Sequence, residues 1–405
     1  MKGAIMTRMQ RIDDRRPSSP GRGEDMPEKL VHLITAVRPN FMKIAPLSHA
    51  LRREPWARAV LVHTGQHYDL NMSDVFFRDL GLSAPDHNLE VGSGPHGEQT
   101  GQVMARYERL LMEERPDVVV VPGDVNSTLG CTLAAVKMGV KVAHLEAGLR
   151  SFDRTMPEEI NRVVTDAVAD LLWTPSPDAD ENLAREGVPP ERIERIGNIM
   201  IDSLEMLREV IEADGSRERL GLDERGYVLT TLHRPANVDD PAVLARICGG
   251  LCAIAHDTPV CFPVHPRTAA RLDAAGLRGT LADCGVRLME PLGYTSFMNL
   301  VFGAKLVLTD SGGVQGESTY LGIPCLTVRP RIEQSAAALR GANRLIDSAQ
   351  VAAAVRDVLQ RGMPRSSPPP LWDGCAAPRA VASLKRFLFP AEQAAAGTPR
   401  SKRTA

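Results

Sequence analysis

No apolar run in this 405-residue sequence approaches the ~20 residues of a membrane-spanning helix. The chain also lacks an excess of charge of one sign, since its formal net charge is only −2. A protein without a basic surplus has no general attraction for nucleic acid or for an anionic lipid surface. We therefore expect no nucleic-acid and no membrane partner, and any anionic ligand must be held by local positive groups.

The seven cysteines form no C-x-x-C pair and mostly lie in apolar runs. This usage is typical of buried thiols in a reducing compartment, so the sequence predicts a cytoplasmic protein. Cys248 and Cys252 could share one face of a helix, but two thiols alone make a poor metal site.

Residues 1–26 are rich in Arg, Ser, Pro and Gly and contain no apolar core of a signal peptide. They are predicted to be a disordered leader or a misassigned start. The prolines in MPRSSPPP (363–370) cannot continue a helix. The residues after them predict one final helix within 376–390, and 391–405 are predicted to form a disordered tail.

Short apolar runs alternate with helical patterns along most of the chain. The runs at 30–37, 57–65, 116–123 and 140–148 predict buried parallel strands. After a charge-rich helical bridge at about 200–225 the alternation restarts, with runs at 227–234, 259–266, 286–291, 304–313 and 324–330. Two successive doubly wound α/β domains, at 27–200 and 201–375, fit this pattern better than one large sheet.

Chemically active side chains are densest in HLEAGLRSFDRTMPEEINR, residues 144–162, which follows an apolar strand. Ligands of open α/β sheets bind at the carboxyl ends of the strands. Glu146, Glu158 and Glu159 are therefore predicted to do more than keep a loop soluble. Asp124 directly follows another buried strand in VVVVPGDVNST, a position typical of functional carboxylates.

The segment VLTDSGGVQGESTYLG, residues 307–322, has the features of a phosphate seat. Gly312 and Gly313 let backbone amides at a helix start approach an anion. Ser311 adds a hydroxyl donor, and Glu317 is placed to accept ribose hydroxyls. No G-K-[ST] follows, so this is not a Walker loop.

Cationic groups follow strands in both halves. Arg38 and Lys43 come after the first strand and would neutralise a diphosphate without making the protein basic. His233 and His265 end two strands of the second half, and neither belongs to an H-x-x-x-H or H-E-x-x-H pattern. We therefore predict ligand contact and no metal. Together these features imply a nucleotide-linked substrate, with the nucleotide on the second half and the carboxylates on the first.

A series of motifs in a fixed order now becomes visible over about residues 30–385: RPNFMKIAPL, TGQHYD, GDVNSTL, HLEAGLRSFDRTMPEEINR, GNIMIDSL, LHRPANVD, PVHPRT, EPLGY, LTDSGGVQGES and LWDG. The chain thereby resembles the non-hydrolysing UDP-N-acetylglucosamine 2-epimerases. The resemblance implies a GT-B fold, with two Rossmann-like doubly wound domains and the active site in the cleft between them. It also implies a homodimer without a cofactor or metal.

The activity implied by the resemblance is interconversion of UDP-GlcNAc and UDP-ManNAc, or of a closely related UDP-2-acetamido sugar. UDP is eliminated to leave a 2-acetamidoglucal and is then added back. Carried over motif by motif, the catalytic positions are Asp124, Glu146, Glu158, Arg162 and His233. The UDP-contacting positions are Arg38, Lys43, Phe297 near the uracil, Ser311, Gly312, Gly313 and Glu317 on the ribose. The resemblance leaves open which carboxylate is the base.

Three segments depart from the family pattern. RIEQS at 331–335 stands where the family has T-E-R-P, so Gln334 replaces an arginine near the diphosphate. Arg329 or Arg331 are candidates to supply the lost positive charge. The Q-E-E motif is reduced to Gln315-Gly316-Glu317, and GQHYD at 65–69 differs from the form associated with allosteric regulation. The alternatives are a hydrolysing epimerase that releases ManNAc and UDP, a GT-B glycosyltransferase, and an inactive sugar-nucleotide sensor.

Overall fold

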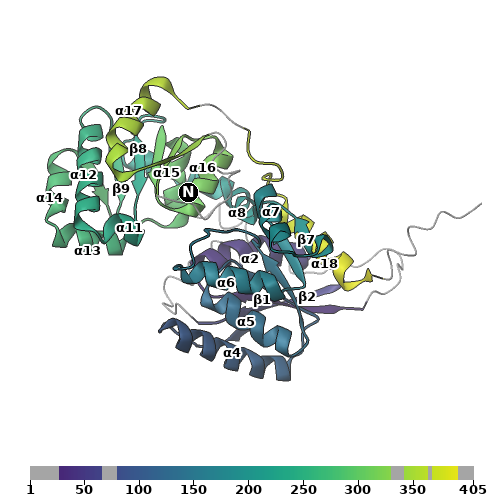
Figure 1. Ribbon diagram of the computed structural model, residues 1–405. Helices are drawn as coiled ribbons and strands as arrows, with labels where there is room; N and C mark the ends of the chain where they lie inside the picture. Colours follow the sequence, from purple (N-terminus) through teal and green to yellow (C-terminus); the bar gives the residue numbers. More distant parts are fainter. Residues whose placement is uncertain (1–26, 66–79, 330–341, 364–366, 391–405) are drawn as a thin grey trace, which may run out of the picture.

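The computed structural model describes residues 27–65, 80–329, 342–363 and 367–390. These residues form two lobes, each a parallel sheet with helices on both of its faces (Figure 1). The predicted leader and tail, the segment RIEQS and most of GQHYD lie outside the described residues. The domain boundaries drawn from the sequence stay predictions.

The first sheet has seven parallel strands in the order β3-β2-β1-β4-β5-β6-β7. They are β1 (Lys29–Thr35), β2 (Ala57–His63), β3 (His87–Asn88), β4 (Val118–Pro122), β5 (Lys141–Leu145), β6 (Leu171–Thr174) and β7 (Ile193–Arg195). The helices around them are α2 (Arg38–Leu51), α4 (His96–Glu113), α5 (Asn126–Lys137), α6 (Pro157–Val168), α7 (Pro177–Arg185) and the short η1 (Pro190–Arg192).

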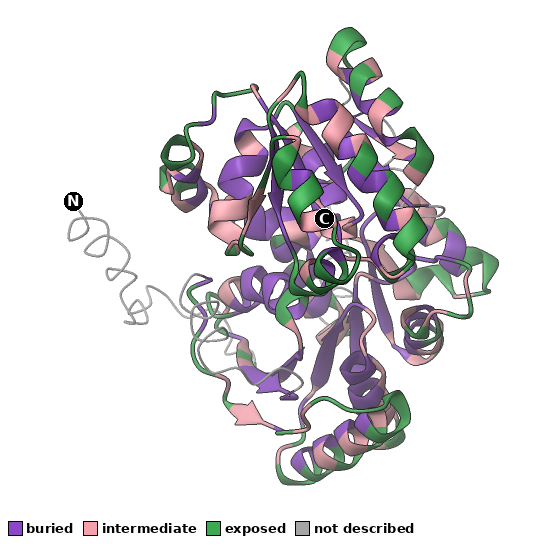
Figure 2. Cartoon of the chain, turned by 90° about the vertical axis from the view of Figure 1, so that its left-hand side faces the viewer, coloured by how far each residue is buried: buried purple, intermediate pink, exposed green. Residues whose placement is uncertain are grey.

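The apolar sequence of β4 shows why this sheet is covered on both faces. Successive side chains of a strand point to opposite faces. Val118 and Val120 accordingly pack into one hydrophobic core, and Val119 and Val121 into a second core on the other side. Figure 2 shows the buried residues gathered on the strands and the inward faces of the helices. A strand buried on both faces reads as a continuous apolar run, as the sequence predicts.

The second sheet has six parallel strands in the order β10-β9-β8-β11-β12-β13. They are β8 (Val228–Thr231), β9 (Val260–Pro263), β10 (Val286–Met289), β11 (Leu306–Thr309), β12 (Cys325–Val328) and β13 (Asn343–Ile346). Its helices are α11 (Pro235–Val238), α12 (Pro241–Ala255), α13 (Pro266–Ala274), α14 (Leu277–Asp283), α15 (Tyr294–Gly303), α16 (Gly312–Leu321), η2 (Ser348–Gln350) and α17 (Val351–Arg361). Both sheets therefore have the doubly wound order, and the predicted fold class is confirmed.

Three helices join the lobes: α8 (Ile199–Met206), α9 (Arg208–Ala213) and α10 (Ser216–Arg219). The first of them packs against α2 of the first lobe and α16 of the second. One hydrophobic cluster spans both, since it contains Phe41 and Met42 from α2, Leu204 from α8 and Met298 from α15. The start of α2, where Arg38 lies, is thereby anchored beside the second lobe.

The final helix, α18 (Ala376–Leu388), returns to the first lobe (Figure 1). The indole of Trp173 donates a hydrogen bond to Ser383 at 2.9 Å, and the carboxylate of Asp202 accepts from the backbone amides of Ala376 and Ala377 at 3.1 and 2.7 Å. A carboxylate at a helix start satisfies amides that lack a partner within the helix. This accounts for the last helix predicted from the sequence.

One cysteine pair differs from the sequence prediction. Cys252 on α12 and Cys284 after α14 form a disulfide, with their Cα atoms 5.3 Å apart. The expectation that all cysteines are thiols is therefore wrong for this pair. The two residues are 32 positions apart, and only the packing of α12 against α14 brings them together. Cys131, Cys248, Cys261 and Cys325 are buried thiols, whereas Cys375 is exposed.

Candidate active site

Four loops lie at the two places where the chain order of the sheets reverses. They follow β1 and β4 in the first sheet and β8 and β11 in the second. Such switch points are where doubly wound sheets bind ligands, because the flanking loops diverge and leave a crevice. Three of these loops carry Asp124, His233 and Ser311. Arg38 is the first residue of the helix that follows the loop after β1.

Lys43 and Glu146 form an ion pair at the carboxyl edge of the first sheet. Lys43 is buried on α2, and its ammonium group donates a hydrogen bond to the carboxylate of Glu146. Gly123, in the turn after β4, lies against this pair, since a Cβ atom there would be 2.9 Å from the Lys43 Nζ. The same glycine has φ +66°, a left-handed conformation that suits glycine. The turn therefore favours glycine for two reasons: the backbone is left-handed, and a side chain would crowd the ion pair.

The backbone of Glu146 is itself unusual, with φ +75° immediately after β5. A non-glycine residue in this conformation carries a cost of about 1–3 kcal/mol, and such residues cluster at functional sites. The strained conformation gives a physical reason to regard Glu146 as a functional residue, independent of any motif.

Asp124 is held by α6 from the other side. Its carboxylate accepts a hydrogen bond from the guanidinium of Arg162, and its backbone carbonyl accepts one from the Asn161 side chain at 2.8 Å. Arg162 is nearly inaccessible to solvent, so this charge-assisted bond is well shielded. The structure therefore brings Asp124 and Arg162 together, and it adds Asn161, which the sequence analysis did not single out.

The neighbours Glu158 and Glu159 have different surroundings. Glu158 lies in the first turn of α6 and is half-buried, and its carboxylate makes no hydrogen bond or ion pair within the described ranges. Glu159 is buried and accepts from the Ser151 amide, the Ser151 hydroxyl and the Phe152 amide at 2.9, 3.1 and 3.1 Å. It also pairs with Arg162. Glu159 therefore holds the loop before α6 in place, whereas Glu158 keeps a carboxylate available for a ligand.

In the second lobe, α16 begins at Gly312 directly after Ser311. The Ser311 side chain does not cap the helix, so its hydroxyl accepts no hydrogen bond from the backbone amides of the first turn. At Gly313 only the Ser311 hydroxyl would lie within 4.0 Å of a Cβ atom. Amides at a helix start lack intrahelical acceptors and point outward. The helix start thus leaves open space beside the backbone of Gly313, and the anion site at this position stays a prediction.

Glu317 lies one turn further along α16 and is buried. Burial raises its pKa to about 7. The phenol of Tyr294 on α15 donates a hydrogen bond to it at 2.7 Å, which fixes the orientation of the carboxyl group. Phe297, on the same helix as Tyr294, packs against the hydrophobic cluster that joins the lobes. Tyr294 was not predicted from the sequence, although it stands in the EPLGY motif.

His233 is oriented by Asp310, the residue before Ser311. The fully buried carboxylate of Asp310 accepts from the backbone amides of His233 and Arg234 and from the Asn237 side chain at 2.9–3.1 Å. The His233 Nδ1 lies 3.2 Å from it. Burial alone would raise the pKa of Asp310, but its partners, His233 foremost, hold that pKa below its usual range. Asp310 therefore joins the loops after β8 and β11 and holds the partly exposed side chain of His233 through its Nδ1.

The other cations differ in their environment. Arg38 is exposed, yet the surrounding protein desolvates its guanidinium and lowers its pKa. His265 lies beside His233, with ring centroids 5.5 Å apart, and its ring accepts from the Arg267 amide. The Arg267 side chain is instead bound to Asp239 on the surface. Arg329 donates from its Nε to the Asp310 carbonyl at 2.8 Å, while Arg331 and Gln334 lie outside the described residues.

In the part of the chain that the structure describes, no helix is both long and apolar enough to cross a membrane. Nor do three or more His, Cys, Asp or Glu side chains gather there in a metal-binding arrangement.

Two doubly wound domains with functional groups at their switch points define an α/β enzyme of the GT-B class. The model of the UDP-N-acetylglucosamine 2-epimerase family matches residues 49–385. The chain therefore belongs to this family of isomerases, and the resemblance noted in the sequence is confirmed.

Individual relatives agree. The UDP-N-acetylglucosamine 2-epimerase of Methanocaldococcus jannaschii is 42% identical over 323 residues, which cover 78% of this chain and 87% of that protein. The UDP-2,3-diacetamido-2,3-dideoxy-D-glucuronate 2-epimerase of Pseudomonas aeruginosa is 40% identical over 321 residues, 78% of this chain and 88% of that protein.

Solved structures give the same result. The crystal structure of the M. jannaschii enzyme in complex with UDP-GlcNAc and UDP has a TM-score of 0.79 and 38% identity, over 88% of this chain and 99% of that chain. The Neisseria meningitidis epimerase bound to UDP-GlcNAc has a TM-score of 0.80 and 25% identity, over 88% of this chain and all of that chain (100%).

Proposed function

We propose that this protein interconverts UDP-GlcNAc and UDP-ManNAc without releasing the sugar. The observation that carries the proposal is that Asp124 and Glu146 follow the neighbouring strands β4 and β5, with Glu158 one turn before the Arg162 that binds Asp124, in a chain of this family. Two of these carboxylates are paired with buried cations, Arg162 and Lys43. Glu158 has no such partner in the described ranges.

The chemistry follows from the substrate. The hydrogen on carbon 2 of the sugar is not next to a carbonyl, so its direct removal would require a cofactor that accepts electrons. Breaking the anomeric C–O bond first sends its electron pair to the β-phosphate oxygen of UDP and leaves an oxocarbenium ion. The carbon-2 proton is then acidic, and a carboxylate takes it as the C1–C2 double bond of the glycal forms. Return of a proton to the opposite face and re-addition of UDP complete the epimerisation.

In this proposal the first domain stabilises the oxocarbenium ion and transfers the carbon-2 proton. Asp124 and Glu146 keep fixed negative charge near the anomeric carbon because their counter-ions hold them in place. Glu158 is the carboxylate that takes up the carbon-2 proton, because no cation binds it within the described residues. Arg162 positions Asp124 through the bond described above.

The second domain and α2 hold UDP through both steps. The amides of Gly312 and Gly313 and the Ser311 hydroxyl receive the diphosphate, with Arg38 and His233 as additional donors. Glu317 accepts from the ribose, and Phe297 lies near the uracil. Retention of UDP is essential, because a lost leaving group turns the epimerase into a hydrolase.

A second substrate is favoured by one observation. The relative that acts on a UDP-2,3-diacetamido uronate is 40% identical to this chain, close to the 42% of a UDP-GlcNAc enzyme. Both sugars carry a 2-acetamido group, and the elimination chemistry is the same for both.

The test is incubation of the purified protein with UDP-GlcNAc in D2O, followed by NMR of carbon 2. Deuterium at that carbon together with UDP-ManNAc supports the proposal. The diacetamido uronate is tested in parallel, and exchange with that sugar alone would reassign the substrate. Free UDP and ManNAc would indicate hydrolysis, and no exchange with either sugar would refute both proposals.

We further propose a cytoplasmic homodimer that serves cell-surface polysaccharide synthesis. The family resemblance supports the dimer, and a nucleotide-sugar substrate supports the location and the role. Light scattering on the purified protein tests the assembly, since a single species at 44.0 kDa would be the monomer. Deletion of the gene followed by analysis of the surface polysaccharide tests the role.

A further inference from the structure

A buried histidine lies directly under the proposed catalytic carboxylates. His144 is in β5, two residues before Glu146, and its side chain has no exposure to solvent. Its Nδ1 is 2.6 Å from the Asp166 Oδ1, and its Nε2 is 2.7 Å from the backbone carbonyl oxygen of Gly123. The mechanism above gives this histidine no task.

The contact with Gly123 requires a hydrogen on the ring nitrogen. A backbone carbonyl only accepts hydrogen bonds, so the Nε2 of His144 must donate to Gly123. The Oδ2 of Asp166 accepts from the Gly148 amide at 3.0 Å and lies 2.7 Å from Arg150, and its Oδ1 is bonded to the Nδ1 of His144. Burial alone would raise the pKa of Asp166, but its interactions with His144 and Arg150 outweigh this and lower it.

The buried ring therefore makes two hydrogen bonds, and each of them holds a different loop. Through Nε2 it fixes the Gly123 carbonyl, which belongs to the same peptide plane as the Asp124 amide. Through Asp166 it is linked to Gly148, two residues after the strained Glu146.

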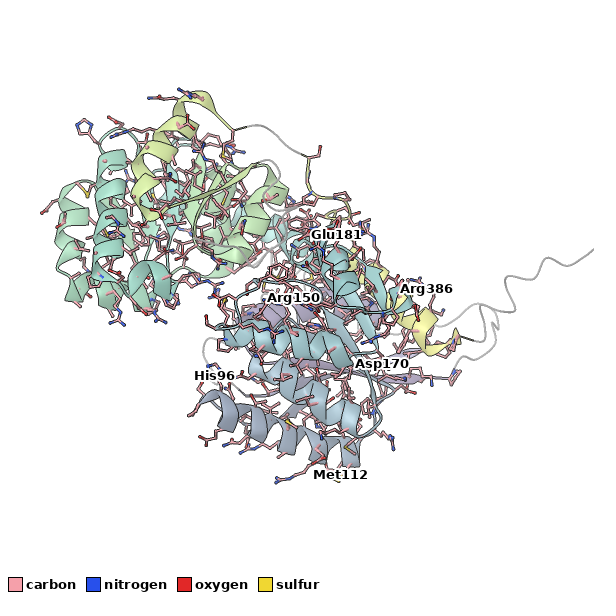
Figure 3. All side chains as sticks on the ribbon, in the orientation of Figure 1. His96, Met112, Arg150, Asp170, Glu181 and Arg386 are labelled. Atoms are coloured by element: carbon pink, nitrogen blue, oxygen red, sulfur yellow. A yellow bond between two sulfur atoms is a disulfide. The ribbon has the colours of Figure 1, made fainter. Side chains whose placement is uncertain are left out.

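Helix α6 completes the arrangement. Glu158, Arg162 and Asp166 are spaced four residues apart on it, so they lie on one face of the helix. That face presents Glu158 as a free carboxylate, binds Asp124 through Arg162, and binds His144 through Asp166. Arg150, the partner of Asp166, lies at the side of the first lobe turned toward the second lobe (Figure 3).

We propose that His144 is a positioning residue of the epimerase, a buried ring that holds the Gly123 turn by a hydrogen bond and so sets Asp124 relative to Glu146. The inference rests on the proposed function for its kinetic consequence. It deepens that function, since it assigns a buried histidine, besides Lys43 and Arg162, to the placement of the carboxylates.

Replacing His144 by glutamine or by asparagine removes one of its two hydrogen bonds at a time. In H144Q the amide nitrogen reaches the place of Nε2 and can still donate to Gly123, whereas in H144N it reaches the place of Nδ1 and can donate only to Asp166. We expect H144N to lower kcat by about 100-fold, the effect of a small misplacement of catalytic groups, and H144Q to stay within about tenfold of wild type. UDP affinity, measured by calorimetry, should be unchanged in both.

The matched control is H32Q. His32 is also buried in the first sheet, in β1, where its ring contacts Tyr107 and Glu114. This variant should lose thermal stability and keep the wild-type kcat per folded molecule. If H144N behaves like H32Q, or if H144Q is slower than H144N, the positioning role is overturned.

A joint neutron and X-ray structure of the wild-type protein tests the hydrogen bond to Gly123 without any variant. Deuterium on the Nε2 of His144, directed at the Gly123 carbonyl, is the expected result, and a bare Nε2 would overturn the inference even if both variants fail to fold. Absence of turnover in the wild type with either sugar would instead refute the proposed function and leave the neutron result valid.

Discussion

Lys43 and Glu146, 103 positions apart in the sequence, are joined by a hydrogen bond from ammonium to carboxylate. The pair connects α2, which shares a hydrophobic cluster with the second lobe, with the loop after β5, where the backbone of Glu146 is strained. Because both side chains are largely buried, each depends on the other for compensation of its charge.

The first prediction concerns this pair. K43M and E146Q should each lower the rate of carbon-2 exchange strongly, and the double variant should be little worse than the slower single variant. Residues in direct contact typically show a coupling of about 0.5–3 kcal/mol in such a cycle. Deuterium incorporation measured for the four proteins gives the coupling energy.

Lys137 offers the control, since it is an exposed lysine at the end of α5. K137M combined with E146Q should show no coupling. Fully additive effects of K43M and E146Q would mean that the ion pair has no functional role.

The second prediction separates two adjacent glutamates. E158Q should reduce exchange by about 10²–10⁴-fold, the usual contribution of a general acid or base, with unchanged thermal stability. E159Q should destabilise the protein by about 1–3 kcal/mol, because buried donors of Ser151 and Phe152 lose their charged acceptor. Denaturant unfolding and the exchange assay together measure both effects, and the reverse pattern would exchange the roles of the two residues.

The contrast between Glu158 and Glu159 marks what the sequence could not predict. Neighbouring helical residues face different directions, and only the path of the loop before α6 decides which of the two is buried. The fold class and the loops that carry Asp124, Ser311 and His233 were predictable, because apolar runs followed by polar residues define strand ends. That information is local in the sequence.

Features that depend on tertiary contacts were missed. Asp310 stands in a motif that was recognised, but its role became visible only when β8 and β11 were neighbours. The positive φ of Glu146 could not be predicted, because glutamate does not favour this backbone conformation. The disulfide between Cys252 and Cys284 likewise depends on the packing of two helices, and no spacing rule indicates it.

The third prediction is a pH dependence of stability due to Glu317. Its pKa is raised to about 7 in the folded protein, against ~4.3 for an unfolded glutamate. Between these values the folded state keeps a proton that the unfolded state has lost, so the free energy of unfolding falls as the pH rises. Urea unfolding from about pH 5 to about pH 8 should show this decline in wild type and a weaker decline in E317Q.

Y294F is the companion variant. The hydrogen bond from Tyr294 lowers the pKa of Glu317, so its removal should raise that pKa further and extend the decline in stability to higher pH. Parallel pH profiles for wild type and E317Q would show that Glu317 does not titrate in this range.

The fourth prediction uses two glycines with nearly the same backbone. Gly123 and Gly139 have φ +66° and +70°, so alanine at either position incurs a similar backbone penalty of about 1–2 kcal/mol. Their surroundings differ: a Cβ at 123 would lie 2.9 Å from the Lys43 Nζ and 3.5 Å from the Glu146 Oε2, whereas at 139 the nearest atom is a guanidinium nitrogen of Arg115 at 3.8 Å.

Because the end of a lysine side chain is flexible, G123A should displace the Lys43 ammonium and break its bond to Glu146 while the protein stays folded. We therefore expect similar losses of thermal stability in G123A and G139A, and a loss of carbon-2 exchange only in G123A. The exchange rate of G139A, corrected for the folded fraction, should equal that of wild type. Equal exchange rates in the two variants would show that the Gly123 turn tolerates a side chain beside the ion pair, and that the close approach at this position has no part in catalysis.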